Sequence, residues 1–177
     1  MIYKIADIED QIIATLQADT GNFSGVRVDT YAGQVSAQMF QNPEFMQGMI
    51  QILPFCLISY QGRTSQKMLE DSSGKTHIHT LRFRLYIGAK STRSTKEAVR
   101  GCYPIMSASF EAIHSHCPAT QAPQEFSGVY DTLSGTPLAA GNHIFSVIES
   151  EPNSEELIVN IPGIVCYRSD YTLKLLA

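Results

Sequence analysis

Two β-forming segments decide the fold of this chain: residues 53–60, which read LPFCLISY, and residues 77–87, which read HIHTLRFRLYI. The first is apolar at nearly every position, the pattern of a strand that is covered on both faces. The second alternates, so its large apolar side chains share one face and its polar ones the other: Leu81, Phe83, Leu85 and Ile87 against Thr80, Arg82, Arg84 and Tyr86. One face of this strand is therefore expected to be packed, and the other to meet solvent or a partner.

A polar stretch from Gln61 to Lys75 separates these segments. A compact domain rarely keeps so long a connection without a use for it. The stretch contains no histidine, cysteine or glycine-rich phosphate cradle, so we interpret it as an arm that contacts another macromolecule. Because only Met68 and Leu69 offer apolar surface, we expect the arm to be mobile alone and ordered on a partner. The candidate contact residues are Arg63, Lys67, Met68, Leu69, Lys75, Arg82 and Arg84.

Two longer helices are predicted. The first contains an apolar stripe at helical spacing and ends near Gly21: Ile5, Ile8, Ile12 and Leu16. The second opens with the capping-box spacing of Ser94 and Glu97. Pro104 either kinks this helix or marks its true start near Tyr103. Its predicted buried stripe is Val99, Cys102, Met106, Phe110 and Ile113.

The remaining segments are shorter. A strand is predicted over Val26–Tyr31 and a brief helix after Asn42-Pro43, and three further strands over Phe145–Glu149, Leu157–Ile161 and Val165–Leu176. The region from Cys117 to Gly141 reads as a second surface loop. No repeat or linker divides the chain. We therefore predict one α+β domain, residues 1–177, with the helices on a mainly antiparallel sheet and long polar loops.

Composition excludes several classes of protein. A chain of 177 residues that is 44% hydrophobic suits one packed core. Its formal charge of −4, without a basic run, disfavours tight nucleic-acid binding. No window approaches the roughly 20 apolar residues of a membrane span, and acids near the N-terminus argue against a secretory signal. Four cysteines at no recurring spacing favour a reduced, soluble cytoplasmic protein.

None of the candidate chemical sites in the sequence supports an enzymatic function. His77, His79, His114, His116 and Cys117 could form a metal site if they met in space, but their spacing matches no familiar pattern, so we predict no metal. The serine-rich segments Ser72-Ser73 and Ser91 to Ser94 read as turn and cap residues. The glutamates at 149, 151, 155 and 156 read as a solvated turn around Pro152-Asn153-Ser154. Arg82 and Arg84 could bind an anion, guard a strand edge or contact another subunit, and we favour the last.

The order of segments resembles that of the Mu-type tail-terminator family, known from Mu-like prophages and similar in fold to the lambda tail terminator. The resemblance covers most of the chain. It rests on the opening amphipathic helix, the strand and turn from Val28 to Gly33, the segment from Leu53 to Gly62, the helix around Gly101-Cys102-Tyr103, and the apolar closing strand.

The resemblance implies a non-enzymatic tail terminator without catalytic residue, cofactor or metal. Such a protein forms a homo-hexameric ring that caps the tail tube at its final length and offers the head or neck connector a docking surface. It assembles in the cytoplasm of the bacterial host and ends in the virion tail, where DNA is only cargo in the lumen. An acidic balance suits such a lumen. The alternatives are another head-tail connector or neck protein and, from a different class, a small metal-dependent hydrolase.

Overall fold

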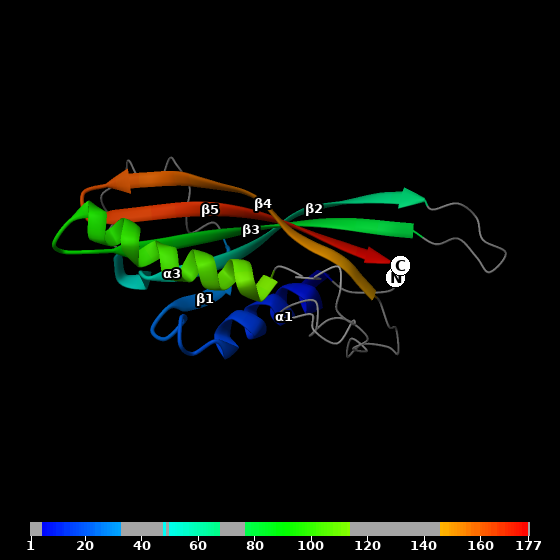
Figure 1. Cartoon of the computed structure of the whole chain (residues 1–177), viewed down its shortest axis with the longest axis horizontal. Helices are drawn as coiled ribbons and strands as arrows, with labels where there is room; N and C mark the ends of the chain where they lie inside the picture. Colours follow the sequence, from blue (N-terminus) through cyan, green and yellow to red (C-terminus); the bar gives the residue numbers. More distant parts are fainter. Residues whose placement is uncertain (1–4, 33–47, 49, 68–76, 114–145, 177) are drawn as a thin grey trace, which may run out of the picture.

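The computed structural model describes residues 5–32, 48, 50–67, 77–113 and 146–176. Its elements in chain order are α1 (Ile5–Ala18), β1 (Arg27–Thr30), β2 (Phe55–Lys67), β3 (His77–Lys90), α3 (Thr95–Ile113), β4 (Ser146–Ile161) and β5 (Ile164–Leu176). The strands form one sheet in the order β1-β2-β3-β5-β4. Only the β1–β2 pair is parallel. Both helices lie along the same face of this sheet (Figure 1), which confirms the predicted α+β fold with a mainly antiparallel sheet.

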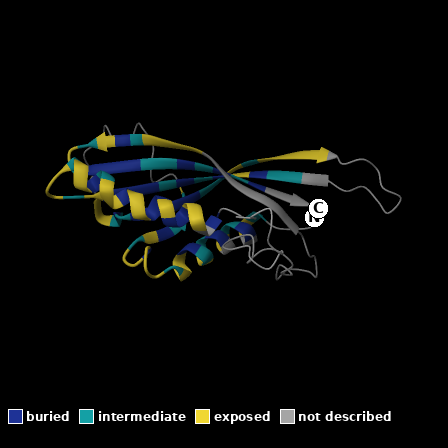
Figure 2. Cartoon of the chain, in the orientation of Figure 1, coloured by how far each residue is buried: buried dark blue, intermediate teal, exposed yellow. Residues whose placement is uncertain are grey.

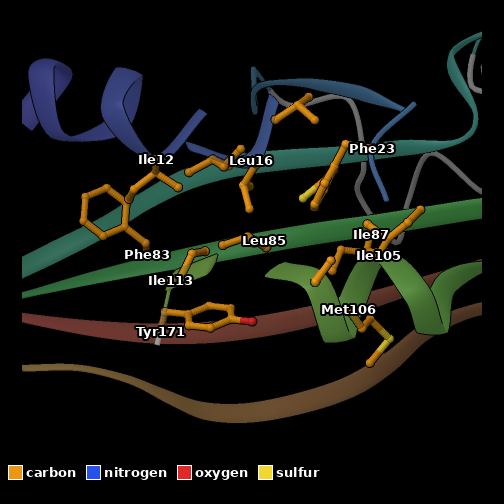
Figure 3. Close-up of a cluster of buried hydrophobic side chains, with 14 of the residues drawn as sticks. Ile12, Leu16, Phe23, Phe83, Leu85, Ile87, Ile105, Met106, Ile113 and Tyr171 are labelled. Atoms are coloured by element: carbon orange, nitrogen blue, oxygen red, sulfur yellow. The ribbon is translucent and has the colours of Figure 1, made fainter. Parts of the chain in front are cut away.

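The main core lies between the two helices and the sheet. From α1, the predicted stripe residues Ile8, Ile12 and Leu16 are fully buried. Figure 3 shows Ile12 and Leu16 on the α1 side of this core, with Phe83 and Leu85 of β3 and residues of α3 and β5 around them. Complete burial of each such side chain stabilises the fold by about 1.5–3 kcal/mol. This core fixes both helices on one face of the sheet.

A smaller core lies on the face of the sheet opposite α1 and α3. It consists of Leu53, Phe55, Leu57, Val159, Ile164 and Cys166. Phe55 to Ile58 are all fully buried, two on each face, so the prediction that this strand is covered on both sides is confirmed. Gly88 belongs to this close packing, because a Cβ atom there would lie 2.6 Å from Cζ of Phe55.

The start of α3 shows the serine half of the predicted capping box, whereas the Glu97 carboxylate binds Ser91 rather than the Ser94 backbone N–H. The backbone N–H of Glu97 donates to the Ser94 hydroxyl at 3.2 Å, and the Glu97 carboxylate accepts a hydrogen bond from the Ser91 hydroxyl at 2.8 Å. The helix runs through Pro104 without ending, so a start near Tyr103 is wrong.

The buried stripe of α3 agrees with the prediction in part. Cys102, Met106 and Ile113 are buried and Val99 is partly buried, as predicted, whereas Phe110 keeps 39% of its surface exposed. The remaining buried positions of the helix are Ala98, Ile105, Ala108 and Ser109. The apolar face of α3 is wider than its buried stripe. The sequence alone therefore does not determine which of the apolar residues are buried.

The polar stretch after Tyr60 is not wholly a loop. β2 continues to Lys67, and its residues Arg63–Lys67 pair with Leu81–His77 of β3 after a register shift at Gly62. The loop prediction is therefore wrong for Gln61–Lys67, because cross-strand hydrogen bonds with β3 stabilise a segment whose own side chains are polar. At the right of Figure 1 these ends of β2 and β3 extend beyond the helices. Residues 68–76, with Met68, Leu69 and Lys75, lie outside the described residues, so the predicted mobility of the arm stays a prediction.

β4 replaces the two strands and the acidic turn that the sequence indicated. It is one strand of 16 residues at the edge of the sheet, and its register against β5 shifts at three places, one of them between Pro152 and Ser154. β-Bulges at these register shifts accommodate the residues whose types had indicated a turn. Bulges, a proline and charges are also the features that prevent an edge strand from pairing with a foreign strand.

The β4–β5 turn is fixed to the start of α3. Gly163 has φ 78°, a conformation that favours glycine, and a Cβ atom there would lie 2.7 Å from the Ser91 carbonyl oxygen. The Ser91 N–H donates to the Gly163 carbonyl at 2.8 Å, and the Gly163 N–H donates to the Thr95 hydroxyl at 3.3 Å. These contacts hold β4 beside α3.

The other sequence predictions have mixed outcomes. β1 confirms the strand predicted at Val26–Tyr31, although it is shorter. Of the helix predicted after Asn42-Pro43, only positions 48 and 50–52 are described, and they are helical. The loop predicted between Cys117 and Gly141 lies outside the described residues. No helix in the described ranges is long and apolar enough to cross a membrane.

Candidate functional site

Charge is divided between the two sides of the sheet. β2 and β3 together carry five basic residues and no acidic one, whereas β4 carries four glutamates and no basic residue. The strand order places β3 and β5 between β2 and β4. With strands about 4.8 Å apart, β2 and β4 are separated by roughly 14 Å. The β2–β3 half of the sheet is therefore basic and the β4 edge is acidic. The charges of β2 and β4 are too far apart to pair with each other directly.

A groove lies on the acidic side, between α3 and β4. We call it the acidic groove; its lining residues are Tyr103, Met106, Ser107, Phe110, Glu111 and Glu155. It encloses about 350 Å³. α3 provides the aromatic side chains because its outer face turns away from the sheet, and Figure 2 shows exposed positions along that face. Pairing of Glu155 with Ser169 of β5 positions the carboxylate on the helix side of the sheet.

Apolar surface is unusually exposed around the acidic groove. Tyr103 is 50% exposed and Leu157 of β4 is 41% exposed. The Tyr103 ring lies 6.4 Å from the ring of Tyr167 on β5, and burial is the main cause that raises the pKa of Tyr167 above its ordinary value. Tyr167 therefore stays neutral at physiological pH. Aromatic rings beside two exposed carboxylates form a surface that suits a long basic side chain.

The opposite, basic feature is the end of the β2–β3 pair that extends beyond the helices. We call it the basic ribbon and define it as residues 61–67 of β2 with 77–82 of β3. It is one edge of the sheet, because residues 78–82 of β3 also pair with residues 172–176 of β5. Arg63 and Arg82 are exposed, and Lys67 is the last residue of β2. β1 pairs only with residues 55–58 of β2, so among the described strands none covers the outer edge of the ribbon. Three of the seven predicted contact residues thus lie at this end of the sheet, with Arg63 and Arg82 on opposite faces.

Arg84 has a different role from Arg82. Its guanidinium binds Asp170 of β5 through two hydrogen bonds of 2.6 and 3.1 Å, and Arg84 and Asp170 are each 25% exposed. The bond to Asp170 is the main cause that raises the pKa of Arg84 further above its usual value. Arg168 joins the network through Asp170, at 3.8 Å, and also binds Glu156 at 2.6 Å. The guanidinium of Arg84 is therefore bound within the sheet, and Arg82 is the exposed member of the two arginines predicted to make contacts.

This network borders a smaller hollow of about 260 Å³ on the face of the sheet opposite α1 and α3. Its lining includes Gln61, Arg82, Arg84, Ser154 and Asp170. The Asp170 carboxylate already neutralises Arg84, so the hollow offers Arg82 alone as an exposed cation. It is a weaker binding surface than the acidic groove.

The residues singled out for metal chemistry are only partly described. His77 and His79 lie two residues apart on β3, whereas His114, His116 and Cys117 lie outside the described residues. In the described part of the chain, no three His, Cys, Asp or Glu residues form a group that could hold a metal ion. The absence of a metal stays a prediction. Ser91 and Ser94 act as turn and cap residues, as predicted.

The described cysteines are buried. Cys56, Cys102 and Cys166 are free thiols without exposed surface. Burial raises the pKa of Cys56 and of Cys102 to about 12, and it raises that of Cys166 further. They act as small apolar side chains, because the reactive form of cysteine is the thiolate.

The sequence did not identify the acidic groove. Phe110 was assigned to the buried stripe, and Glu155 to a turn. The one available signal was the concentration of glutamates between positions 149 and 156. Comparison of the sequence with protein-family models and with curated proteins finds no match.

Proposed function

We propose that this protein is a tail terminator of a phage or tail-like particle: a ring-forming structural subunit, without enzymatic activity, that caps the tail tube and offers the head or neck a docking surface. The proposal is supported by the segment order, which resembles the Mu-type tail-terminator family. The structural observation that carries it is the division of charge between the basic β2–β3 side and the acidic β4 side.

Two different, complementary surfaces on one subunit favour head-to-tail association. A head-to-tail contact repeats from subunit to subunit and closes into a ring when the rotation between neighbours is suitable. A ring can cap a tube, whereas a two-fold dimer uses the same surface twice and ends there. A hexamer is the ring that the family resemblance implies. The formal charge of −4 also disfavours adhesion of DNA that passes through such a ring.

The oligomeric state tests this function. Light scattering coupled to size-exclusion chromatography, with and without the purified tail-tube protein, should detect a ring of six subunits in at least one condition. A stable dimer in both conditions would contradict the proposal.

A second experiment distinguishes the terminator from its nearest alternative. A phage that lacks its own terminator should produce tails of uncontrolled length without heads, and this chain should restore tails of normal length in electron micrographs. If the protein binds the neck but not the tube, and tail length is normal without it, it is a head-tail connector instead.

A further inference from the structure

The outer face of α3 is divided by charge along its length. Lys96 and Arg100 lie in the N-terminal half of the helix, and we call them the basic half of α3. Tyr103, Ser107 and Glu111 follow at spacings of three or four residues, so all of these positions share one face of the helix, and all are exposed. The basic half therefore leads along one face into the acidic groove, which the C-terminal half of α3 lines.

This arrangement of charges does not serve the helix itself. The helix dipole favours acids near the N-terminus and cations near the C-terminus. Lys96 lies in the first turn and Glu111 in the last, each at the end where the dipole opposes its charge. The first turn also contains Glu97, but its carboxylate binds Ser91 at 2.8 Å. Lys96 and Arg100 lie four residues apart, a spacing at which like charges repel. Neutralisation by a partner accounts for charges that the helix alone disfavours.

The two halves of the helix face cannot neutralise each other within one subunit. Arg100 and Glu111 are separated by roughly 16 Å along the helix axis, at 1.5 Å per residue. Neither residue forms an ion pair with another residue in the part of the chain that the structure describes, and the same holds for Lys96 and Glu155. Their charges are therefore available to a second molecule.

We infer that the acidic groove of one copy of this chain receives the basic half of α3 of a second copy. The exposed carboxylates of Glu111 and Glu155 bind the two arriving cations. The ring of Tyr103, 50% exposed, offers the arriving Arg100 a surface on which its guanidinium stacks. As the contact that closes a ring, the inference rests on the proposed function; as a contact between two copies, it is tested separately.

A second copy fits the groove in shape as well as in charge. The aliphatic stems of lysine and arginine cover apolar surface while their charged ends reach carboxylates. The groove, of about 350 Å³, has both kinds of surface, since Met106 and Phe110 lie beside the glutamates. Lys96 and Arg100 lie about one helical turn apart on one face, so both can enter together. The basic ribbon is a poorer match, because its exposed arginines lie on opposite faces of the sheet.

Of the two neighbouring glutamates of β4, only Glu155 faces the groove. Glu156 lies opposite Arg168 in the register and binds it at 2.6 Å on the other face of the sheet. Glu155 lies opposite Ser169, on the face that carries α3. The alternation of the strand thus gives one carboxylate to the fold and the other to a cation from outside the subunit.

Charge reversal on each surface tests the inference. The groove variant E111K/E155K and the helix variant K96E/R100E should each associate more than about 100-fold more weakly than the wild type, because like charges then face each other. An equimolar mixture should restore association, since the new lysines meet the new glutamates and the unchanged basic half meets the unchanged groove. Size-exclusion chromatography with light scattering over a range of concentrations, with tube protein if the wild type requires it, measures both effects.

Matched variants change charges away from the contact. D10K reverses an exposed aspartate on α1, and R82E reverses an exposed arginine of the basic ribbon. Both should associate as the wild type does. The neutral variant E111Q/E155Q should weaken association less than the reversal. K96E agrees with the helix dipole, so thermal melts should show that loss of association in the helix variant is not loss of the fold.

The outcomes separate this inference from the proposed function. If the wild type forms rings and both reversals form them equally well, or if the mixture does not restore what they lose, the inference is wrong and the function stands. If R82E weakens association and K96E/R100E does not, the ribbon occupies the groove and the inference is again wrong. If the contact closes a dimer and no ring forms, the inference stands and the function fails. A wild type that is monomeric in every condition contradicts both.

Discussion

Arg84 of β3 and Asp170 of β5 lie directly opposite each other in the sheet and form a two-point ion pair, Nε to Oδ1 at 2.6 Å and Nη2 to Oδ2 at 3.1 Å. Asp170 also lies 3.8 Å from Nε of Arg168. Asp170 therefore binds Arg84 directly and lies near Arg168, whose closer partner is Glu156. The pair joins the two central strands of the sheet at a point where the second core ends.

Substitution of Asp170 should destabilise the fold. D170N keeps the shape of the side chain but leaves Arg84 without its charged acceptor, so the free energy of unfolding should fall by about 1–3 kcal/mol. The matched control is D29N, which breaks the Arg27–Asp29 pair, whose side chains are 50% and 49% exposed. Its effect should be below about 1 kcal/mol. Urea denaturation measures both, and equal effects would contradict the special role of Asp170.

Gly88 should not tolerate a larger residue. In G88A the new methyl group would meet the buried Phe55 ring at 2.6 Å and Leu53 at 2.7 Å, which should cost about 1–3 kcal/mol in the free energy of unfolding. A smaller partner should relieve part of this strain, so the double variant G88A/F55L should lose less stability than the two single changes added together. Strictly additive losses in thermal or urea unfolding would show that the two sites do not touch.

Glu9 should make stability depend on pH. Burial is the main cause that raises its pKa above the ordinary 4.5, the neighbouring Asp10 adds to this, and a hydrogen bond with Thr30 opposes it. A carboxyl whose pKa is raised by folding stabilises the protein fully below its unfolded pKa, and this stability is lost as pH rises through the folded pKa. E9Q should therefore be more stable than the wild type at pH 7.

The same advantage should vanish below about pH 4.5, where the wild-type carboxyl is protonated. Urea denaturation of both proteins at several pH values between pH 3.5 and pH 7 measures the difference. This range extends from roughly one unit below the ordinary pKa of the carboxyl group to neutral pH. E111Q removes an exposed glutamate and is the control, for which we expect little change. An E9Q advantage that is constant over this range would contradict the assignment.

The thiols of Cys56, Cys102 and Cys166 should resist modification. Burial raises the pKa of Cys56 and Cys102 to about 12, so almost no thiolate forms at pH 8, and access is blocked as well. A thiol-disulfide reagent should modify these three residues only after denaturation, as followed by absorbance and located by peptide mass spectrometry. Rapid modification of Cys56 in the native protein would show that β2 opens locally.

Strongly periodic elements were predictable from the sequence. The stripe of α1, the capping of α3 by Ser94 and the alternation of β3 each depend on residues close in the chain, and the structure confirms them. The extension of β2 was not predictable, because Gln61–Lys67 is polar and becomes a strand only through its pairing with β3. Local propensity fails where the stabilising partner is supplied by another strand.

The acidic groove could not be predicted for a related reason. Its two walls, α3 and β4, are separated in the chain by residues 114–145, and β4 itself contains the proline and polar residues that normally indicate a turn. An edge strand needs no continuous apolar face, so its sequence carries a weak signal. The pairing of β4 with β5, the packing of α3 on the sheet and the contacts of the β4–β5 turn with Ser91 and Thr95 together bring Glu155 next to Tyr103 and Phe110.

The attachment of β4 has a consequence for synthesis. Among the described strands β4 pairs only with β5, and β5 follows β4 in the chain. A nascent or truncated chain that ends before β5 can pair β2 with β3, but it has no described strand on which to hold β4. The wall that Glu155 contributes to the acidic groove is therefore positioned only after β5 has been synthesised.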